Sequence, residues 1–311
     1  MKPTWRRVLF LLVVMAALVA GCGGSEEPTA TADETTATPA APAPTITIGT
    51  KNFTEQYVLG ELYRQALEAK GYDVELKSDI GSTEIIDAAL TSGQIDMYPE
   101  YTGTALTVVF GEEGSAESAE ETYERAKELY EERGQTLLAM TPFSDSDAIA
   151  VTKATATEHG LETIADLKKL PRLRLGGQPE FRTRSQGLPG LERNYGLTDV
   201  QFVPLAGISP YEALDRGRVD AAAIFSTDPA LATGSYVVLE DTEAQFGFQN
   251  VAPVVDADLA AELGDDFADT VDAVSRLLTE EAIIAMNSAV AIDQRPAAEV
   301  AREFLEANDL L

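Results

Sequence analysis

The chain contains one cysteine and one histidine, and these two scarcities exclude several kinds of site. A single cysteine cannot form a disulfide within the chain, and it rules out cysteine-based zinc sites. A single histidine, His159, removes most catalytic and metal-binding arrangements that depend on imidazole. We therefore expect neither a metal nor a cofactor.

Basic side chains are scarce as well. The 23 Lys and Arg residues stand against 52 Asp and Glu, so the formal net charge is −29. A surface this acidic repels phosphate backbones, and we expect no binding to nucleic acid. With 311 residues, 45% of them hydrophobic, the chain is long enough for one large or two ordinary domains.

The N-terminus carries an apolar run that is too short for a membrane span. Residues 8–20 are all apolar and follow a basic segment with Lys2, Arg6 and Arg7. A membrane-spanning helix needs about 20 such residues, whereas a shorter run is typical of a signal peptide. The run leads into Gly21-Cys22, which resembles the lipobox of bacterial lipoproteins. This resemblance implies a signal peptide over residues 1–21 and a lipid on Cys22; the alternative is an ordinary signal peptide with a stray cysteine.

Residues 23–45 contain no large apolar side chain and are rich in Thr, Ala and Pro. Such a segment cannot bury enough apolar surface to fold, so it predicts a disordered tether. Residues 22–45 then form a lipidated cysteine and a linker, and the globular part works at the outer face of a membrane.

Alternating and helical hydrophobic patterns begin at Ile46 and occur in the same order twice. The first copy predicts strands at 45–49, 72–77 and 94–97, with helices over 55–70, capped by Thr54, and 82–90. The second predicts strands at 173–176, 200–204 and 219–224, with helices over 188–195 and 210–216. Strands that alternate with helices favour two similar α/β lobes built on parallel strands.

Matching flanks support this internal repeat. Ala-Leu-x-x-Gly-x-x-Asp occurs at residues 89–96 and again at 213–220, and an aromatic residue follows each Asp by five positions, Tyr101 and Phe225. Asp96 and Asp220 suggest two-carboxylate chemistry or, as we prefer, a structural role at equivalent strand ends. No nucleophile elbow, zinc-protease motif or Walker loop is present, so we do not expect an enzyme, although a secreted enzyme that uses a cleft is an alternative.

The remaining segments predict how the lobes are connected. Residues 136–152 cross from the first lobe to the second, and the chain turns at 250–253 before helices over 259–277, 280–289 and 296–308, the last with Asp293 as its N-cap. We expect lobe 1 to comprise 46–147 and 249–311, and lobe 2 to comprise 148–248. Because ligands of open α/β sheets bind beyond the carboxyl ends of the strands, two facing lobes predict a ligand cleft.

Several long segments resemble the osmoprotectant-binding proteins of ABC importers, which take glycine betaine, choline and proline betaine. They are GTKNFTEQ at 49–56, IDMYPEYTGT at 95–104, GLPGLE at 187–192, FSTD at 225–228 and AREFL at 301–305. The resemblance covers about residues 46–311. It implies a class-II periplasmic-binding-protein fold, in which two α/β lobes close on a ligand. It also implies two partners, a membrane permease and its ATPase, and a protein that is itself monomeric.

The resemblance also implies where the ligand binds. The first lobe supplies matches to known contacts at Lys51, Tyr101 and Thr104, and Asp147 matches a polar contact on the crossover. Arg184 is the best match for the arginine that binds the ligand carboxylate; Arg182 is the alternative, and a surface salt bridge is the other role open to Arg184. A methylated cation cannot donate hydrogen bonds and is held by aromatic faces, whereas a carboxylate suits the planar fork of an arginine.

The aromatic cage expected of such a site is incomplete here. Ile149 and Gln249 stand where the family has aromatic residues, and Phe225 stands where a tyrosine is usual. The assignment of Gln249 can slip by one position, in which case Phe246 or Phe248 supplies a ring. Tyr211 belongs either to the pocket or to a helix surface.

We therefore predict a lipid-anchored receptor that captures a quaternary-ammonium or related zwitterionic osmolyte outside the cell. Two alternatives stay open. One is a ligand-sensing lipoprotein with the same fold, and the other is a receptor for an amino compound that is not a betaine.

Overall fold

The computed structural model describes residues 44–112 and 118–311. The predicted signal peptide, Cys22 and nearly all of the predicted linker lie outside the described residues. Among the helices of the described part, none is both long and apolar enough to cross a membrane.

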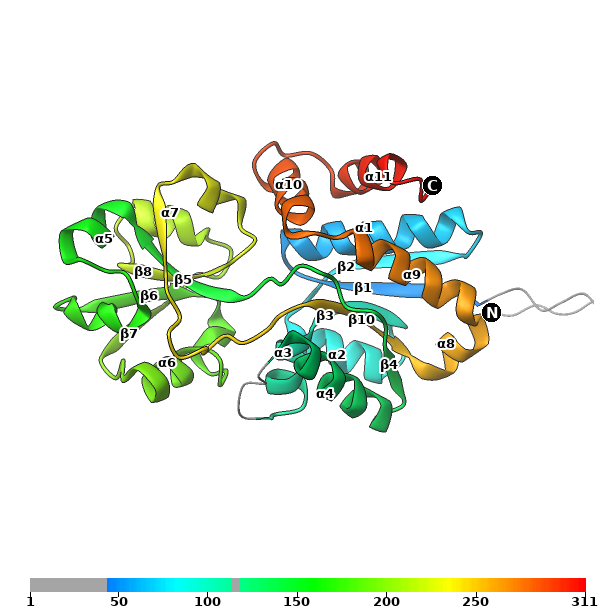
Figure 1. Cartoon of the computed structure of the whole chain (residues 1–311), viewed down its shortest axis with the longest axis horizontal. Helices are drawn as coiled ribbons and strands as arrows, with labels where there is room; N and C mark the ends of the chain where they lie inside the picture. Colours follow the sequence, from blue (N-terminus) through cyan, green and yellow to red (C-terminus); the bar gives the residue numbers. More distant parts are fainter. Residues whose placement is uncertain (1–43, 113–117) are drawn as a thin grey trace, which may run out of the picture. The chain divides into compact units, whose positions relative to one another are not determined.

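The first sheet has the strand order β2-β1-β3-β10-β4 (Figure 1). β1 pairs in parallel with β2 and β3, and β10 runs antiparallel to both β3 and β4. We call this sheet and the helices around it the first lobe. Its strands are β1 (Ile46–Lys51), β2 (Val74–Gly81), β3 (Met97–Tyr101), β4 (Gln135–Leu137) and β10 (Val251–Asp256).

The second sheet repeats this arrangement with the order β7-β6-β8-β5-β9. β6 pairs in parallel with β7 and β8, and β5 runs antiparallel to β8 and β9. This sheet and its helices form the second lobe. The predicted repeat is therefore present. Its strands are β5 (Asp147–Thr152), β6 (Leu173–Gly177), β7 (Val200–Pro204), β8 (Ala221–Phe225) and β9 (Tyr236–Leu239).

Asp96 and Asp220 make the same contact in the two lobes. The Asp96 carboxylate accepts a 2.8 Å hydrogen bond from the backbone N–H of Thr47, and the Asp220 carboxylate accepts one of 2.8 Å from the N–H of Arg174. Each aspartate thus fastens the start of its strand to the neighbouring parallel strand, and the preferred structural interpretation is confirmed.

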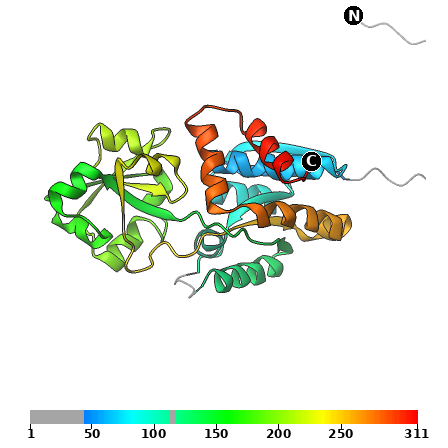
Figure 2. The ribbon, with the colours of Figure 1, turned by 45° about the horizontal axis from the view of Figure 1, so that its top comes forward.

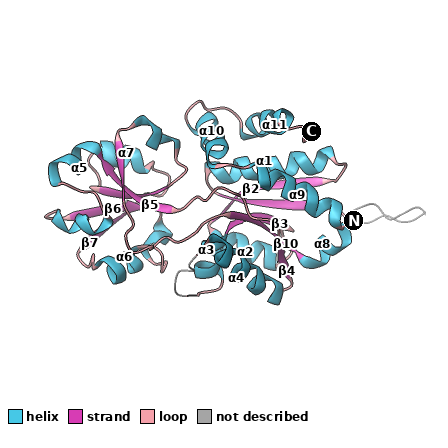
Figure 3. Cartoon of the chain, in the orientation of Figure 1, coloured by secondary structure: helices cyan, strands magenta, loops and turns pink. Residues whose placement is uncertain are grey.

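Helices cover both faces of each sheet (Figure 3). In the first sheet, Ile48 and Val255 pack with one helical layer while Tyr98 and Val254 pack with the other, as the pleat of a strand requires. The helices of the first lobe are α1 (Thr54–Ala69), α2 (Thr83–Thr91), α3 (Thr102–Thr104) with the π-helical turn Ala105–Val109, α4 (Ala119–Glu132), α8 (Ala257–Leu263), α9 (Asp265–Leu277), α10 (Glu280–Ala291) and α11 (Ala297–Ala307). Those of the second are α5 (Lys153–His159), α6 (Leu188–Tyr195) and α7 (Pro210–Asp215), with 3₁₀ turns at Ile164–Lys169, Pro179–Arg182 and Pro229–Thr233.

Two crossovers, residues 138–146 and 240–250, join the lobes (Figure 1). They pair with each other, because Ser144 and Asn250 form an antiparallel bridge and the Asp145 N–H donates to the Gln249 carbonyl. The chain then returns to the first lobe, where α10 and α11 pack on α1 as expected (Figure 2).

Two prolines that face each other explain why the positions of two strands were predicted wrongly from the sequence. The third strand, expected at 94–97, is β3 at 97–101, and the turn expected at 250–253 is the start of β10. Pro99 of β3 faces Pro253 of β10 in register. Proline lacks an N–H and normally argues against a central strand. Here the missing N–H groups leave neither opposite carbonyl without a donor, because the Pro99 carbonyl accepts from the Gln56 side chain and the Pro253 carbonyl accepts from the Leu138 N–H.

Helix ends also differ from expectation. The helix predicted over 259–277 breaks into α8 and α9 at Gly264, whose φ of +76° a helix cannot contain. The N-cap of α11 is Pro296 rather than Asp293, and that of α1 is Phe53 rather than Thr54.

Candidate functional site

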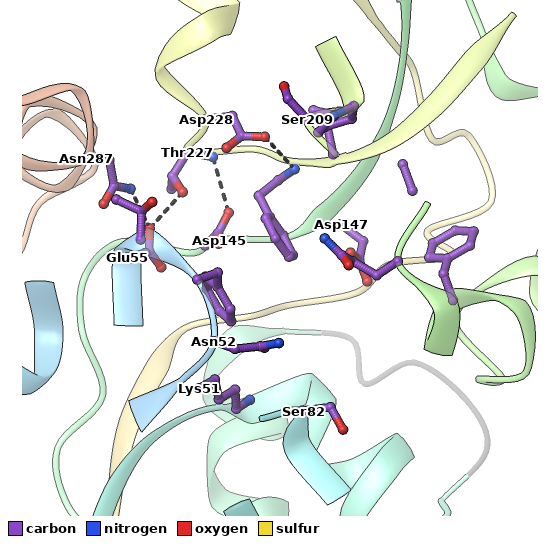
Figure 4. Close-up of a pocket in the computed structure, with 18 of the residues that line it drawn as sticks. Lys51, Asn52, Glu55, Ser82, Asp145, Asp147, Ser209, Thr227, Asp228 and Asn287 are labelled. Carbon is purple, nitrogen blue, oxygen red and sulfur yellow. Dashed lines mark hydrogen bonds between the residues drawn. The ribbon is translucent and has the colours of Figure 1, made fainter. Parts of the chain in front are cut away.

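A cavity of about 710 Å³ is lined by residues of both lobes (Figure 4). It lies at the carboxyl ends of β1, β3 and β8, the start of β5 and the N-terminus of α1, where side chains leave the sheets without being covered by the next layer. Of the eight residues predicted to bind ligand, seven line it: Lys51, Tyr101, Thr104, Asp147, Arg184, Phe225 and Gln249.

Ile149 is the exception. It is fully buried in the core of the second lobe and is not among the residues that line the cavity. Alternation along β5 puts Asp147 and Ile149 on the same face of the sheet, but Asp147 starts the strand at the cavity while Ile149 lies one pleat deeper. The position assigned to a missing ring is therefore a core position.

Lys51 is already neutralised by the protein. Its side chain is 4% exposed and forms an ion pair with the buried Glu100. Glu100 also accepts a 2.6 Å hydrogen bond from the Tyr101 N–H, and the Lys51 ammonium lies 4.9 Å from the centre of the Tyr101 ring. Burial lowers the pKa of Lys51 and the bond to Glu100 opposes that shift.

Arg184 is likewise paired with a carboxylate of the other lobe. Its Nε and Nη2 donate to Glu84 at the start of α2, over 3.2 and 3.0 Å. Burial tends to raise the pKa of Glu84, but hydrogen bonds from Arg184 and Ser82 outweigh it and hold the pKa at about 2. The carboxylate that Arg184 binds in this structure is therefore Glu84.

Glu55 lines the cavity and connects the two lobes (Figure 4). Its carboxylate accepts from Tyr101 Oη at 2.9 Å, Asn287 Nδ2 at 2.9 Å and Thr227 Oγ1 of the second lobe at 2.7 Å. The neighbouring Asp145 accepts from the Thr227 N–H at 3.2 Å. Burial raises the pKa of both carboxyl groups, and their mutual repulsion raises that of Asp145 further.

Three aromatic rings stand in a row across the cavity. Phe53 lies between Tyr101, at 6.1 Å between ring centres, and Phe225, at 5.2 Å, with interplanar angles of 28° and 22°. Phe53 was not predicted as a site residue, although it lies within the GTKNFTEQ motif at 49–56. Its place at the junction of β1 and α1, two residues after Lys51, was the available signal.

Gln249 lies at the cavity, but its amide is used within the protein. Its Oε1 accepts from the Thr104 N–H at 2.9 Å and Thr104 Oγ1 at 3.1 Å, and its Nε2 donates to the Phe246 carbonyl. Phe246 itself is buried in the core of the second lobe, and Phe248 is 37% exposed; neither lines the cavity. Gln249 therefore holds the second crossover to the first lobe.

Tyr211 lines the cavity rather than a free helix surface. Its hydroxyl donates to Asp228 over 2.9 Å, and Asp228 also accepts from the Phe225 N–H at 3.2 Å. These bonds fix the end of β8 and with it the Phe225 ring. Burial raises the pKa of Asp228, and its two donors oppose the shift.

Asp147 differs from all of these side chains. Within residues 44–112 and 118–311, nothing donates a hydrogen bond or forms an ion pair with its carboxylate, and no dashed line reaches it in Figure 4. Burial raises its pKa to about 6, with Glu180 adding to the shift and the positive charges of Arg184 and Lys51 opposing it. It is a carboxylate in the cavity that lacks a counter-charge in direct contact.

The described residues contain no group of three or more His, Cys, Asp or Glu side chains arranged to hold a metal ion. Two α/β lobes joined by paired crossovers, with a polar and aromatic cavity between their strand ends, define a solute-binding protein.

The chain matches the model of the substrate-binding domain of the ABC-type glycine betaine transport system over residues 44–307. It belongs to this family, and it is the substrate-binding component of an ABC transporter. The predicted family and the two-lobed fold are thereby confirmed. Substrate-binding proteins of ABC importers act outside the cytoplasm and deliver their ligand to a permease.

Individual relatives agree. The chain is 32% identical to a glycine-betaine-binding protein of Pseudomonas aeruginosa, covering 87% of this chain and 90% of the relative. It is 29% identical to the glycine betaine-binding protein YehZ of Escherichia coli, covering 86% and 92%. A solved structure of YehZ without ligand superposes with a TM-score of 0.62, covering 86% of this chain and all of that one, at 27% identity.

Proposed function

We propose that this protein captures a small quaternary-ammonium or related zwitterionic osmolyte in the cavity between its lobes and delivers it to a membrane permease. The observation that carries the proposal is the row of Phe53, Tyr101 and Phe225, which draws on both lobes. Aromatic faces attract a methylated cation by about 0.5–2 kcal/mol each, and few other side chains hold a group that cannot donate hydrogen bonds. The relatives named for glycine betaine support this ligand class.

The residues predicted to contact ligand keep this role in the proposal, except for Ile149. The predicted division into residues 46–147 with 249–311 and residues 148–248 is kept, except that Asp147, the first residue of β5, moves with the second lobe; the two lobes then hinge at the paired crossovers. A ligand that contacts Tyr101 on one side and Phe225 on the other stabilises the closed arrangement because it binds that arrangement better.

A ring deletion tests the ligand site. Phe225→Leu removes one aromatic face while it keeps an apolar side chain, so we expect binding of the best ligand among choline, glycine betaine and carnitine to weaken by about 2- to 30-fold. Phe248→Leu is the matched control, because Phe248 is exposed and does not line the cavity. Isothermal titration calorimetry measures both variants. Equal losses in both, or binding of none of the three compounds by the folded wild type, would contradict the proposal.

The proposal includes a lipid anchor on Cys22 that holds the protein at the outer face of the membrane. Its support is the sequence of a basic segment, an apolar run and Gly21-Cys22. Cys22→Ala should move the protein from the membrane fraction to the soluble or secreted fraction, whereas Thr31→Ala in the same segment should leave it membrane-bound. A Cys22→Ala protein that stays in the membrane fraction sinks the anchor assignment.

A further inference from the structure

The positive charges around the cavity are already neutralised. Lys51 and Arg184 are the basic side chains among the described residues that line it, and each has a protein carboxylate of its own, Glu100 and Glu84. A ligand carboxylate therefore finds no free cationic side chain at the cavity within the described part of the chain. To reach Arg184 it must displace Glu84, which is tethered to the same molecule and holds the guanidinium through two hydrogen bonds.

The negative charges are not neutralised in the same way. Among residues 44–112 and 118–311, six acidic residues line the cavity, namely Glu55, Asp79, Asp145, Asp147, Glu180 and Asp228. Some of them accept hydrogen bonds from neutral donors, which stabilise a carboxylate without cancelling its charge. Asp147 and Glu180 have no hydrogen-bond or ion-pair partner for their carboxylates in the described part of the chain, and both belong to the second lobe.

We propose that the cavity selects a ligand with a net positive charge, such as choline, over a zwitterion, and that Asp147 is the counter-ion of the ligand's cationic head. A monocation supplies the charge that Asp147 lacks, and it leaves the Lys51–Glu100 and Arg184–Glu84 pairs intact. A zwitterion brings a carboxylate into a cavity with six acidic side chains and must break an existing ion pair to place it.

This inference rests on the proposed function and makes Asp147 a specificity-determining residue. Choline and glycine betaine form a matched pair of probes because they share the trimethylammonium head and differ in the hydroxyl or carboxylate at the other end. Calorimetry at pH 8 should show that the wild type binds choline at least tenfold more tightly than glycine betaine. Asp147→Asn keeps the shape and removes the charge, so choline should weaken at least tenfold and glycine betaine less than threefold.

Glu84→Gln gives an independent test from the first lobe. It removes the negative charge that neutralises Arg184, so a ligand carboxylate competes only with a neutral amide oxygen: glycine betaine should tighten several-fold while choline stays within threefold of the wild type. Glu158→Gln is the control for net charge, because Glu158 lies on α5 of the second lobe, does not line the cavity and has a side chain that is 76% exposed; it should change neither affinity. Thermal unfolding checks that each variant is folded.

The outcomes separate this inference from the function on which it rests. If the wild type binds glycine betaine as tightly as choline, or if Asp147→Asn weakens both equally, the inference is overturned while the function stands. If the folded wild type binds none of choline, glycine betaine and carnitine, the proposed function is wrong, and the inference that rests on it is wrong as well.

Discussion

The role of each charged side chain at this site depends on the partner that it already has within the protein. Lys51 and Arg184 have the charge expected of contacts to a ligand carboxylate, yet Glu100 and Glu84 occupy them. Asp147 has the opposite character, because it lies in the cavity with its carboxylate unpaired by the described residues. Whether the site prefers a cation or a zwitterion therefore depends on which charged side chains remain unpaired. The number of charges of each sign is a weaker guide to this preference.

At this scale we predict that choline binding depends on pH. The pKa of Asp147 is raised to about 6, so its carboxylate is charged above pH 6 and neutral below it. Since a cation binds the charged form better, affinity should fall about tenfold as pH drops from 7.5 to 5. Choline keeps its charge throughout, so the change belongs to the protein. Titration calorimetry across this range measures it.

The control for this prediction is Asp147→Asn, which should bind choline weakly with a much flatter pH profile. Arg184, Glu180 and Lys51 also act on Asp147; Arg184 stays charged across this range, whereas burial lowers the pKa of Lys51. Glu55 and Asp145 also have raised pKa values, and any slope that persists in the variant is theirs. An unaltered slope in the variant would show that Asp147 is not the titrating group.

At the scale of secondary-structure elements, the two lobes are built by the same local device. In each, an aspartate that follows a helix and a Gly turn accepts the backbone N–H of the neighbouring parallel strand. Asp96→Ala and Asp220→Ala each leave such an N–H without its partner, so we expect a loss of about 1–3 kcal/mol in the free energy of unfolding. Asp220→Ala should cost at least as much as Asp96→Ala, because Asp220 also pairs with the Arg174 side chain.

Urea unfolding measures both losses, and Asp269→Ala on the exposed side of α9 is the control with no expected loss. Neither aspartate lines the cavity, so ligand affinity should stay within twofold of the wild type. A large loss of affinity with unchanged stability would revive a role in ligand chemistry for this pair.

At the scale of the whole molecule, ligand binding should bring the lobes together. Contacts between the lobes include the Thr227–Glu55 and Arg184–Glu84 pairs and the stacking of Phe53 on Phe225, and a ligand that touches Tyr101 and Phe225 adds to them. Small-angle X-ray scattering should therefore give a smaller radius of gyration with saturating ligand than without. Phe225→Leu, at a ligand concentration that leaves it mostly free, is the control and should show no decrease. A radius that saturating ligand leaves unchanged in the wild type speaks against hinge closure.

The sequence by itself determined the family, the two α/β lobes and the region of the ligand site. Periodicity and the repeated Ala-Leu-x-x-Gly-x-x-Asp pattern are local features, and local features predict strands, helices and the strand ends at which side chains are left uncovered. The eight ligand residues were instead predicted from the family resemblance, position by position, and seven of them line the cavity.

Only the tertiary structure decided how those side chains are used. The Arg184–Glu84 pair joins residues that are 100 positions apart in the chain, and the hydrogen bond from Thr227 to Glu55 joins residues that are 172 positions apart. The depth of Ile149 below Asp147 and the position of Phe53 between two rings from different lobes depend on packing between layers. The hydrophobic pattern along a chain indicates which face of a helix or strand a residue occupies. The partner that pairs with a charged side chain depends on segments that come together only when the chain folds.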